Sequence, residues 1–127
     1  LAQKWGAIYG VPLSLILAVI FKESGGNPLA KGPTGDWGLM QITQPALTDF
    51  NNKTGHNWNL LELQDADKNI QVGTWYLSWL YSQLKDWTKT LRAYNVGIGR
   101  IKQSETAGIW YASDVLAIQK KIEEVNV

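Results

Sequence analysis

The chain has 127 residues, 45% of them hydrophobic, which suits one domain with a single core and is too little for two. Twelve basic and eleven acidic residues give a formal net charge of +1 without a basic cluster, so we predict no nucleic-acid partner. The absence of cysteine and the single histidine, His56, exclude disulfides, thiolate metal sites and motifs that need two histidines. We therefore predict no metal site.

Helical patterns dominate the N-terminal part of the chain. Residues 2–9 are predicted to form a short helix that Gly10 ends. Pro12 suits the first turn of a second helix, which reaches residue 24 and has Gly25 as its C-cap. The second helix is apolar on nearly every face, which is typical of a buried helix. Its apolar run is too short to span a bilayer, so we predict no membrane span.

Glycine and proline residues mark the next segment as irregular. Residues 25–38 are predicted to form a loop, at most with a small β-hairpin. Pro45 can begin a short helix that ends near Phe50, and residues 51–64 have a looser pattern. The lone His56 in this looser segment is predicted to be exposed.

Three further helices are predicted in the C-terminal half. A long helix covers residues 66–84 with Asp65 as its N-cap, and Thr88 is expected to cap a helix that ends near Asn95. The last helix covers about residues 107–124. We therefore predict a mainly α, single-domain fold. Three aromatic residues of the long helix are expected to lie in the core: Trp75, Tyr76 and Trp79.

Glu23 is the candidate catalytic residue that the pattern itself indicates. It lies at the C-terminal end of an almost wholly apolar helix. Burial and the negative end of the helix dipole both disfavour a carboxylate, so both raise its pKa. A raised pKa is what a carboxylic acid needs to protonate a leaving oxygen near neutral pH. The alternative is a glutamate that reaches solvent at a frayed helix end.

Three motifs follow one another in a recognisable order. They are Glu23-Ser24-Gly25-Gly26-Asn27-Pro28, Gly38-Leu39-Met40-Gln41-Ile42 and Ala93-Tyr94-Asn95-Val96-Gly97, with Asn69-Ile70 and Gly73 between the last two. In this order and spacing they resemble the soluble lytic transglycosylase domain, a relative of goose-type lysozyme, from about residue 5 to residue 122. The resemblance implies a lysozyme-like fold and makes residues 1–127 one catalytic domain.

The resemblance also assigns roles to individual residues. Glu23 matches the family's catalytic acid. Tyr94 and Asn95 match a pair that approaches this acid and the substrate, and Tyr94 is expected to donate its hydroxyl to the Glu23 carboxyl. Tyr111 matches the family's cleft tyrosine, although it lies slightly farther along the chain than the family pattern places it.

A second motif matches a cleft-lining strand of the family, and its backbone and the Gln41 amide are expected to contact an N-acetylated sugar. The alternative for Met40 is that it only fills a gap in the core. The residues of this expected substrate-binding strand are Gly38, Leu39, Met40 and Gln41.

The activity implied is cleavage of the β-1,4 bond from N-acetylmuramic acid to N-acetylglucosamine in peptidoglycan. Glu23 would serve as the single acid/base, without a cofactor, and 1,6-anhydro ends would form. Asp36 departs from the family pattern, which often has a small residue there, and it could be a second carboxylate. One alternative is therefore a hydrolytic lysozyme in which Asp36 positions water, and another is a non-catalytic peptidoglycan-binding module.

The same resemblance sets expectations for context. The partner would be the glycan strands of peptidoglycan, and the chain would be a monomeric domain of a larger protein. Its site of action would be extracytoplasmic, in the periplasm or cell wall, or on a bacteriophage particle. The chain begins with Leu1 rather than Met, so we expect any targeting segment to lie outside it.

Overall fold

The structure, a computed structural model, describes residues 1–125. Within these residues the fold is built from helices, and β structure is limited to isolated bridges that join Trp37 to Lys31 and to Ile42. This confirms the predicted mainly α class. None of the described helices has the length and apolar character needed to cross a membrane. The helices are α1 (Ala2–Tyr9), α2 (Leu13–Ser24), α3 (Gln44–Thr54), the 3-10 helix η1 (Leu60–Gln64), α4 (Ala66–Leu84), α5 (Trp87–Val96), α6 (Ile98–Gln103) and α7 (Ile109–Val125).

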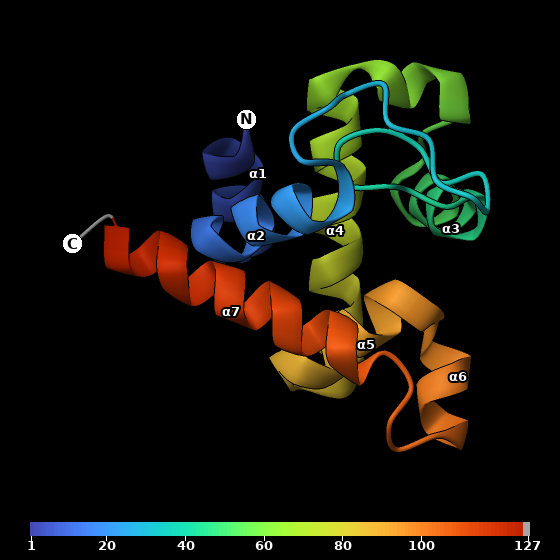
Figure 1. Cartoon of the computed structure of the whole chain (residues 1–127). Coiled ribbons are helices and arrows are strands. Elements are labelled where there is room, and N and C mark those ends of the chain that lie inside the picture. Colours follow the sequence, from blue (N-terminus) through green and yellow to red (C-terminus); the bar gives the residue numbers. More distant parts are fainter. Residues whose placement is uncertain (126–127) are drawn as a thin grey trace.

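Helix α4 is the central element of the fold. It contacts α1, α3, α5 and η1, and Figure 1 shows it passing through the middle of the molecule. Val72, Leu77 and Leu80 on α4 are fully buried. Burial of this kind stabilises the fold by about 1.5–3 kcal/mol per large apolar side chain. The helix therefore gives the site a rigid base.

Helices α2 and α7 pack in antiparallel directions, as Figure 1 also shows. Near one end, Gln119 donates a hydrogen bond to Ser14 over 3.1 Å. Near the other end, Lys22 and Asp114 form an ion pair of 2.9 Å. This register brings the C-terminal end of α2 against the first turns of α7.

Several predicted helix ends are confirmed. Gly10 and Gly25 are C-caps with φ values of 73° and 63°, in the left-handed region that glycine adopts at little cost. The Asp65 side chain caps α4 as expected. The predicted cap Thr88 is wrong, because Asp86, two residues earlier, caps α5 with its carboxylate.

Two elements differ from their predicted extent. Helix α3 continues to Thr54, beyond its predicted end, because Phe50 packs into the core and holds the following turn. Helix α6 was not predicted, since two glycines flank its start. Gly97, with φ 95°, ends α5 and immediately begins α6, while Gly99 is accommodated within the short helix.

The prediction that His56 is simply exposed is wrong. Its ring lies 5.0 Å from the ring of Phe50 and 4.4 Å from that of Trp58. Its Nδ1 lies 2.8 Å from the hydroxyl of Thr54. The half-buried ring thus packs the loop that follows α3 against the core.

Candidate active site

The end of α2 holds Glu23 in a defined position. The Ser24 hydroxyl donates to the Ile20 carbonyl over 3.1 Å and accepts from the Gly26 N–H over 3.1 Å. Together with the left-handed Gly25, these bonds end the helix directly after the acid. Ser24 therefore secures the helix end, a role that the motif itself did not indicate.

The surroundings of Glu23 favour its protonated form. The pKa of Glu23 is raised to about 7, chiefly by burial and to a smaller extent by the charge of Asp36. The hydrogen bond from Tyr111 and the charge of Lys22 act in the opposite direction and only partly offset burial. At neutral pH roughly half of the molecules therefore carry the acid in its protonated form.

The tyrosine that contacts Glu23 is Tyr111, not Tyr94. The Tyr111 hydroxyl donates to Glu23 Oε2 over 3.1 Å, whereas the Tyr94 hydroxyl donates to the Met40 carbonyl over 2.6 Å. The expected bond from Tyr94 to Glu23 is thus wrong. The two rings stack with centroids 6.5 Å apart, so Tyr94 supports Tyr111 from behind.

Burial also fixes the protonation state of both tyrosines. It raises the pKa of Tyr111 and of Tyr94 well above the usual value, and the nearby Glu23 charge adds to the effect. Both phenols therefore remain hydrogen-bond donors over the pH range in which Glu23 titrates.

The segment expected to be a cleft-lining strand is instead a tight turn. Gln41 N–H donates to the Gly38 carbonyl over 3.1 Å, and Trp37 and Ile42 exchange backbone hydrogen bonds of 3.0 Å on either side. Gly38 has φ 79°, and a Cβ there would collide with the Asn69 side chain. Only glycine fits at this position.

The side chains of this turn point into the protein. The Gln41 amide donates to the carbonyls of Ala30, at 3.0 Å, and Gly38, at 2.9 Å, and Gln41 is only 9% exposed. This amide is therefore committed to the loop. Met40 is fully buried against Gly73, as the core alternative predicted, and Leu39 is buried as well.

Buried Asn69 ties the turn to α4. Its Oδ1 accepts from the Met40 N–H over 2.8 Å, and its Nδ2 donates to the carbonyls of Trp37 and Leu63, both at 2.9 Å. Every hydrogen-bonding group of this amide except one lone pair is used. The sequence placed Asn69 in a motif but did not show this function.

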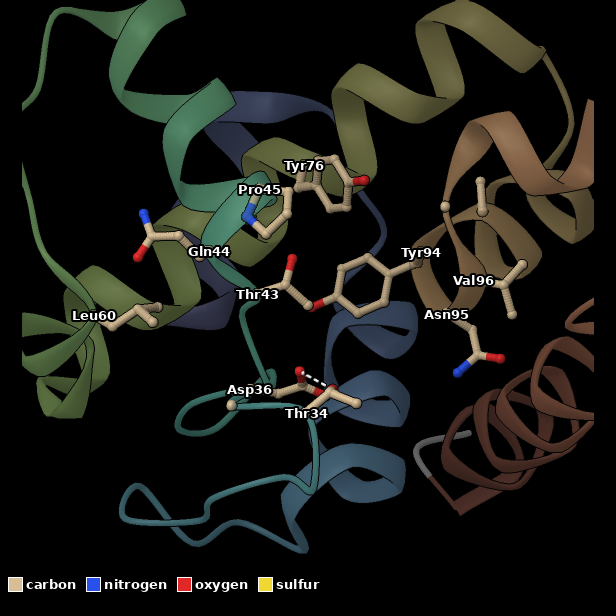
Figure 2. A pocket seen from close by; sticks show the side chains of 13 residues that line it. Thr34, Asp36, Thr43, Gln44, Pro45, Leu60, Tyr76, Tyr94, Asn95 and Val96 are labelled. Carbon is tan, nitrogen blue, oxygen red and sulfur yellow. Dashed lines mark hydrogen bonds between the residues drawn. The ribbon is translucent and has the colours of Figure 1, made fainter.

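A cleft of about 500 Å³ lies between the glycine-rich loop, the start of α3 and the end of α5 (Figure 2). Tyr94 and Asn95 of α5 and Asp36 of the glycine-rich loop line it, and Figure 2 shows Tyr94 and Asp36 on neighbouring walls. Asp36 accepts a hydrogen bond of 2.7 Å from the Thr34 hydroxyl. Glu23 is not part of this lining, but two lining residues lie near it: the charge of Asp36 raises the pKa of Glu23, and the charge of Glu23 raises that of Tyr94.

The structure thus brings some predicted site residues together and separates others. Asp36, Tyr94 and Asn95 line the cleft, and Glu23 and Tyr111 lie next to it. The turn of residues 38–41 supports them from behind. The cleft lining also includes residues that the sequence did not single out for the site: Thr34, Gly35, Thr43, Gln44, Pro45, Leu60, Tyr76, Ala93, Val96 and Gly97.

The prediction that Tyr76 belongs to the core needs correction. This residue is half-buried, as are Trp75 and Trp79, and it forms part of the cleft wall beside Pro45 (Figure 2). Tyr76 follows the motif residue Gly73 by three positions on α4, and this closeness was the signal that could have marked it. In residues 1–125 no group of three or more acidic, histidine or cysteine side chains could hold a metal ion.

A half-buried glutamate with a pKa raised to about 7, near an open cleft in a helical domain, is an arrangement typical of acid/base sites. The chain belongs to the transglycosylase SLT domain family, whose model matches residues 1–113.

The chain is also similar to curated lytic murein transglycosylases. Membrane-bound lytic murein transglycosylase F of Pasteurella multocida is 32% identical over 94 residues, which are 68% of this chain and 18% of that protein. Soluble lytic murein transglycosylase of Escherichia coli is 34% identical over 102 residues, or 72% of this chain and 15% of that protein. The chain therefore spans less than a fifth of the length of these relatives.

Solved structures are similar over nearly the whole chain. The 70 kDa soluble lytic transglycosylase in complex with bulgecin A has a TM-score of 0.86 and 27% identity, covering 98% of this chain and 24% of that one. An inactive Glu-to-Gln mutant of the lytic transglycosylase Slt of Pseudomonas aeruginosa has a TM-score of 0.81 and 25% identity, covering 93% and 22%. These neighbours confirm the predicted lysozyme-like fold.

Proposed function

We propose that this domain cleaves the β-1,4 bond between N-acetylmuramic acid and N-acetylglucosamine in peptidoglycan, with Glu23 as its single acid/base. The observation that carries the proposal is the half-protonated Glu23, held by Tyr111 next to the cleft. The family and the murein transglycosylase relatives support the substrate class. A solved neighbour that is inactive as a Glu-to-Gln mutant supports dependence on one glutamate.

In the first step protonated Glu23 donates its proton to the glycosidic oxygen. The C1–O bond breaks, the N-acetylglucosamine side leaves as an alcohol, and the N-acetyl group of the muramic residue stabilises the positive charge at C1. In the second step the Glu23 carboxylate removes the proton of the C6 hydroxyl. The C6 oxygen then bonds to C1 and closes a 1,6-anhydro ring. Glu23 ends protonated, and no water is consumed.

Tyr111 is the positioning residue for both steps. Its hydroxyl donates to Glu23 Oε2, so it stabilises the carboxylate that exists between the two proton transfers. Tyr94 fixes the Tyr111 ring by stacking and is itself held by the Met40 carbonyl. Exposed Asn95, on the cleft wall, is the amide best placed to contact an N-acetyl group.

A hydrolytic lysozyme is the second candidate, because Asp36 lines the cleft and its charge acts on Glu23. An inverting hydrolase uses a second carboxylate to activate a water on the opposite face of the sugar. Asp36 could fill that role, and muramic acid ends would then be reducing. Its bond with Thr34 instead suits a carboxylate that shapes the loop and keeps Glu23 protonated.

Digestion of purified sacculi distinguishes these candidates. Wild type is expected to release muropeptides that are one water lighter than hydrolysis products, and Asp36→Asn is expected to keep substantial activity and the same product. Reducing ends together with an inactive Asp36→Asn would establish the hydrolase. Binding to sacculi without any loss of turbidity would establish the non-catalytic module.

The place of action follows from the substrate. We propose that the chain works as a monomeric domain of a larger protein, outside the cytoplasm or on a phage particle. The small share of each relative that it covers supports the larger protein, and the murein transglycosylase names support the cell wall as its target.

A further inference from the structure

Trp110, on the first turn of α7, exposes 81% of its surface, although tryptophan has a large apolar face. The neighbouring residue Tyr111 is 8% exposed and donates to Glu23. An open aromatic ring thus lies one residue away from the contact to the catalytic acid. Exposed tryptophan combines apolar area with a polar N–H and is typical of binding surfaces.

The segment that carries Trp110 is rigidly held. Buried Arg92 of α5 donates from Nε to the Ala107 carbonyl over 2.8 Å and from Nη2 to the Ser104 carbonyl over 2.7 Å. A Cβ at Gly108 would lie only 2.9 Å from the Arg92 carbonyl oxygen, so this segment packs directly on the α5 backbone. The ring is therefore presented from a fixed support, which reduces the entropy lost on binding.

The register of α2 and α7 places this ring near the end of α2. Residues four apart on a helix share a face, so Trp110 lies one turn beyond Asp114, which pairs with Lys22. At that level α2 has ended at Ser24, and the following Gly25 and Gly26 are exposed. Both the ring and the residues that follow α2 are therefore open to solvent.

We propose that Trp110 is a sugar-stacking residue that extends the glycan site beyond the cleft, past Glu23. The cleft is lined by no residue of α2 or α7, so this surface is a separate binding position. The ligand is one pyranose ring of a β-1,4-linked, N-acetylated amino-sugar strand. Its apolar C–H face covers the indole, and its hydroxyls meet the charges of Lys22 and Asp114. This proposal rests on the proposed function.

Charged groups one turn from the ring suit a sugar ligand. The ion pair of Lys22 and Asp114 offers a donor and an acceptor to sugar hydroxyls. Apolar side chains are exposed in the same region: Ile109, which precedes Trp110, is 42% exposed, and Phe21 lines a hollow together with Lys22 and Asp114.

Binding of the N-acetylglucosamine hexamer is measured by calorimetry in the non-cleaving Glu23→Gln protein. Adding Trp110→Ala should weaken binding about 3- to 10-fold, the range expected for one aromatic contact, whereas Trp110→Phe should keep most of the affinity. The matched control is Ile8→Ala on α1, where Ile8 is 58% exposed and remote from the site. It should leave affinity unchanged.

In the active protein, Trp110→Ala should raise KM on sacculi while kcat stays within about twofold. The reason is that the ring would contact the bound substrate and the transition state equally. An affinity and KM equal to wild type would overturn the proposal while leaving the proposed function intact. If wild type does not cleave sacculi, the proposed function fails, and the hexamer measurement still decides the role of Trp110. Because Trp110 is exposed, its replacements should unfold at the wild-type temperature.

Discussion

Tyr111→Phe is the sharpest test of how the site controls its acid. The substitution removes one hydroxyl and keeps the ring that stacks on Tyr94. A hydrogen bond to a charged group contributes about 1.5–3 kcal/mol, and the 3.1 Å length of this bond favours the lower end. Because the bond stabilises the carboxylate form of Glu23, its loss raises the pKa of Glu23 above about 7.

Two changes should follow together. Cleavage begins with protonated Glu23, so kcat/KM falls as pH rises through its pKa, and Tyr111→Phe should move this alkaline limb up by about one pH unit. The plateau rate should fall about tenfold, since the carboxylate formed during the reaction loses about 1.4 kcal/mol of stabilisation.

The pH profile of kcat/KM on solubilised glycan strands measures both changes. Tyr94→Phe is the matched control: it breaks the bond to the Met40 carbonyl and leaves the bond to Glu23 in place. It should lower the free energy of unfolding by about 0.5–1.5 kcal/mol with little movement of the limb. A shifted limb in Tyr94→Phe and an unshifted one in Tyr111→Phe would refute the reasoning.

Two further predictions concern stability. Glu23 has a folded-state pKa of about 7 against 4.5 unfolded, so the native state binds more protons between these values and stability falls as pH rises from about 4.5 to 7. Glu23→Gln removes this loss of stability. Its free energy of unfolding in urea should exceed that of wild type by about 1–3 kcal/mol at pH 8, and this gain should disappear near pH 4. An equal gain at both pH values would contradict the buried acid. Gly38→Ala should lower the free energy of unfolding by about 3 kcal/mol or more, because the new Cβ collides with Asn69. Gly35→Ala, at φ 82° but with open space around the Cβ, should lower it by only about 1–2 kcal/mol. Equal melting temperatures of the two variants would argue against the collision.

The sequence was informative where one local rule decides the outcome. The apolar helix that ends at Glu23 indicated both burial and a raised pKa, and the structure has both. Gly25 and Asp65 marked helix ends because left-handed backbone and a capping carboxylate depend on neighbouring residues only. Resemblance to a family then supplied the order of the motifs and the cleft.

The sequence could not decide contacts between distant segments. Tyr94 and Tyr111 are both plausible donors to Glu23, and only the packing of α2 against α7 gives the bond to Tyr111. The Gln41 amide satisfies carbonyls of its own loop, a choice set by the left-handed backbone at Gln41 with φ 52°. Asp86 and Thr88 are both suitable N-cap residues and lie two positions apart, so the sequence alone could not show that Asp86 caps the helix.

The most direct measurement of the central claim is the rate at which Glu23→Gln cleaves purified sacculi. Glutamine keeps the shape of the side chain but cannot give or take the proton, and general acid/base catalysis contributes about 10²–10⁴ in rate. We predict a fall of at least about 100-fold in a protein that folds and still binds the glycan. Retention of more than about a tenth of the wild-type rate would show that Glu23 is not the acid/base.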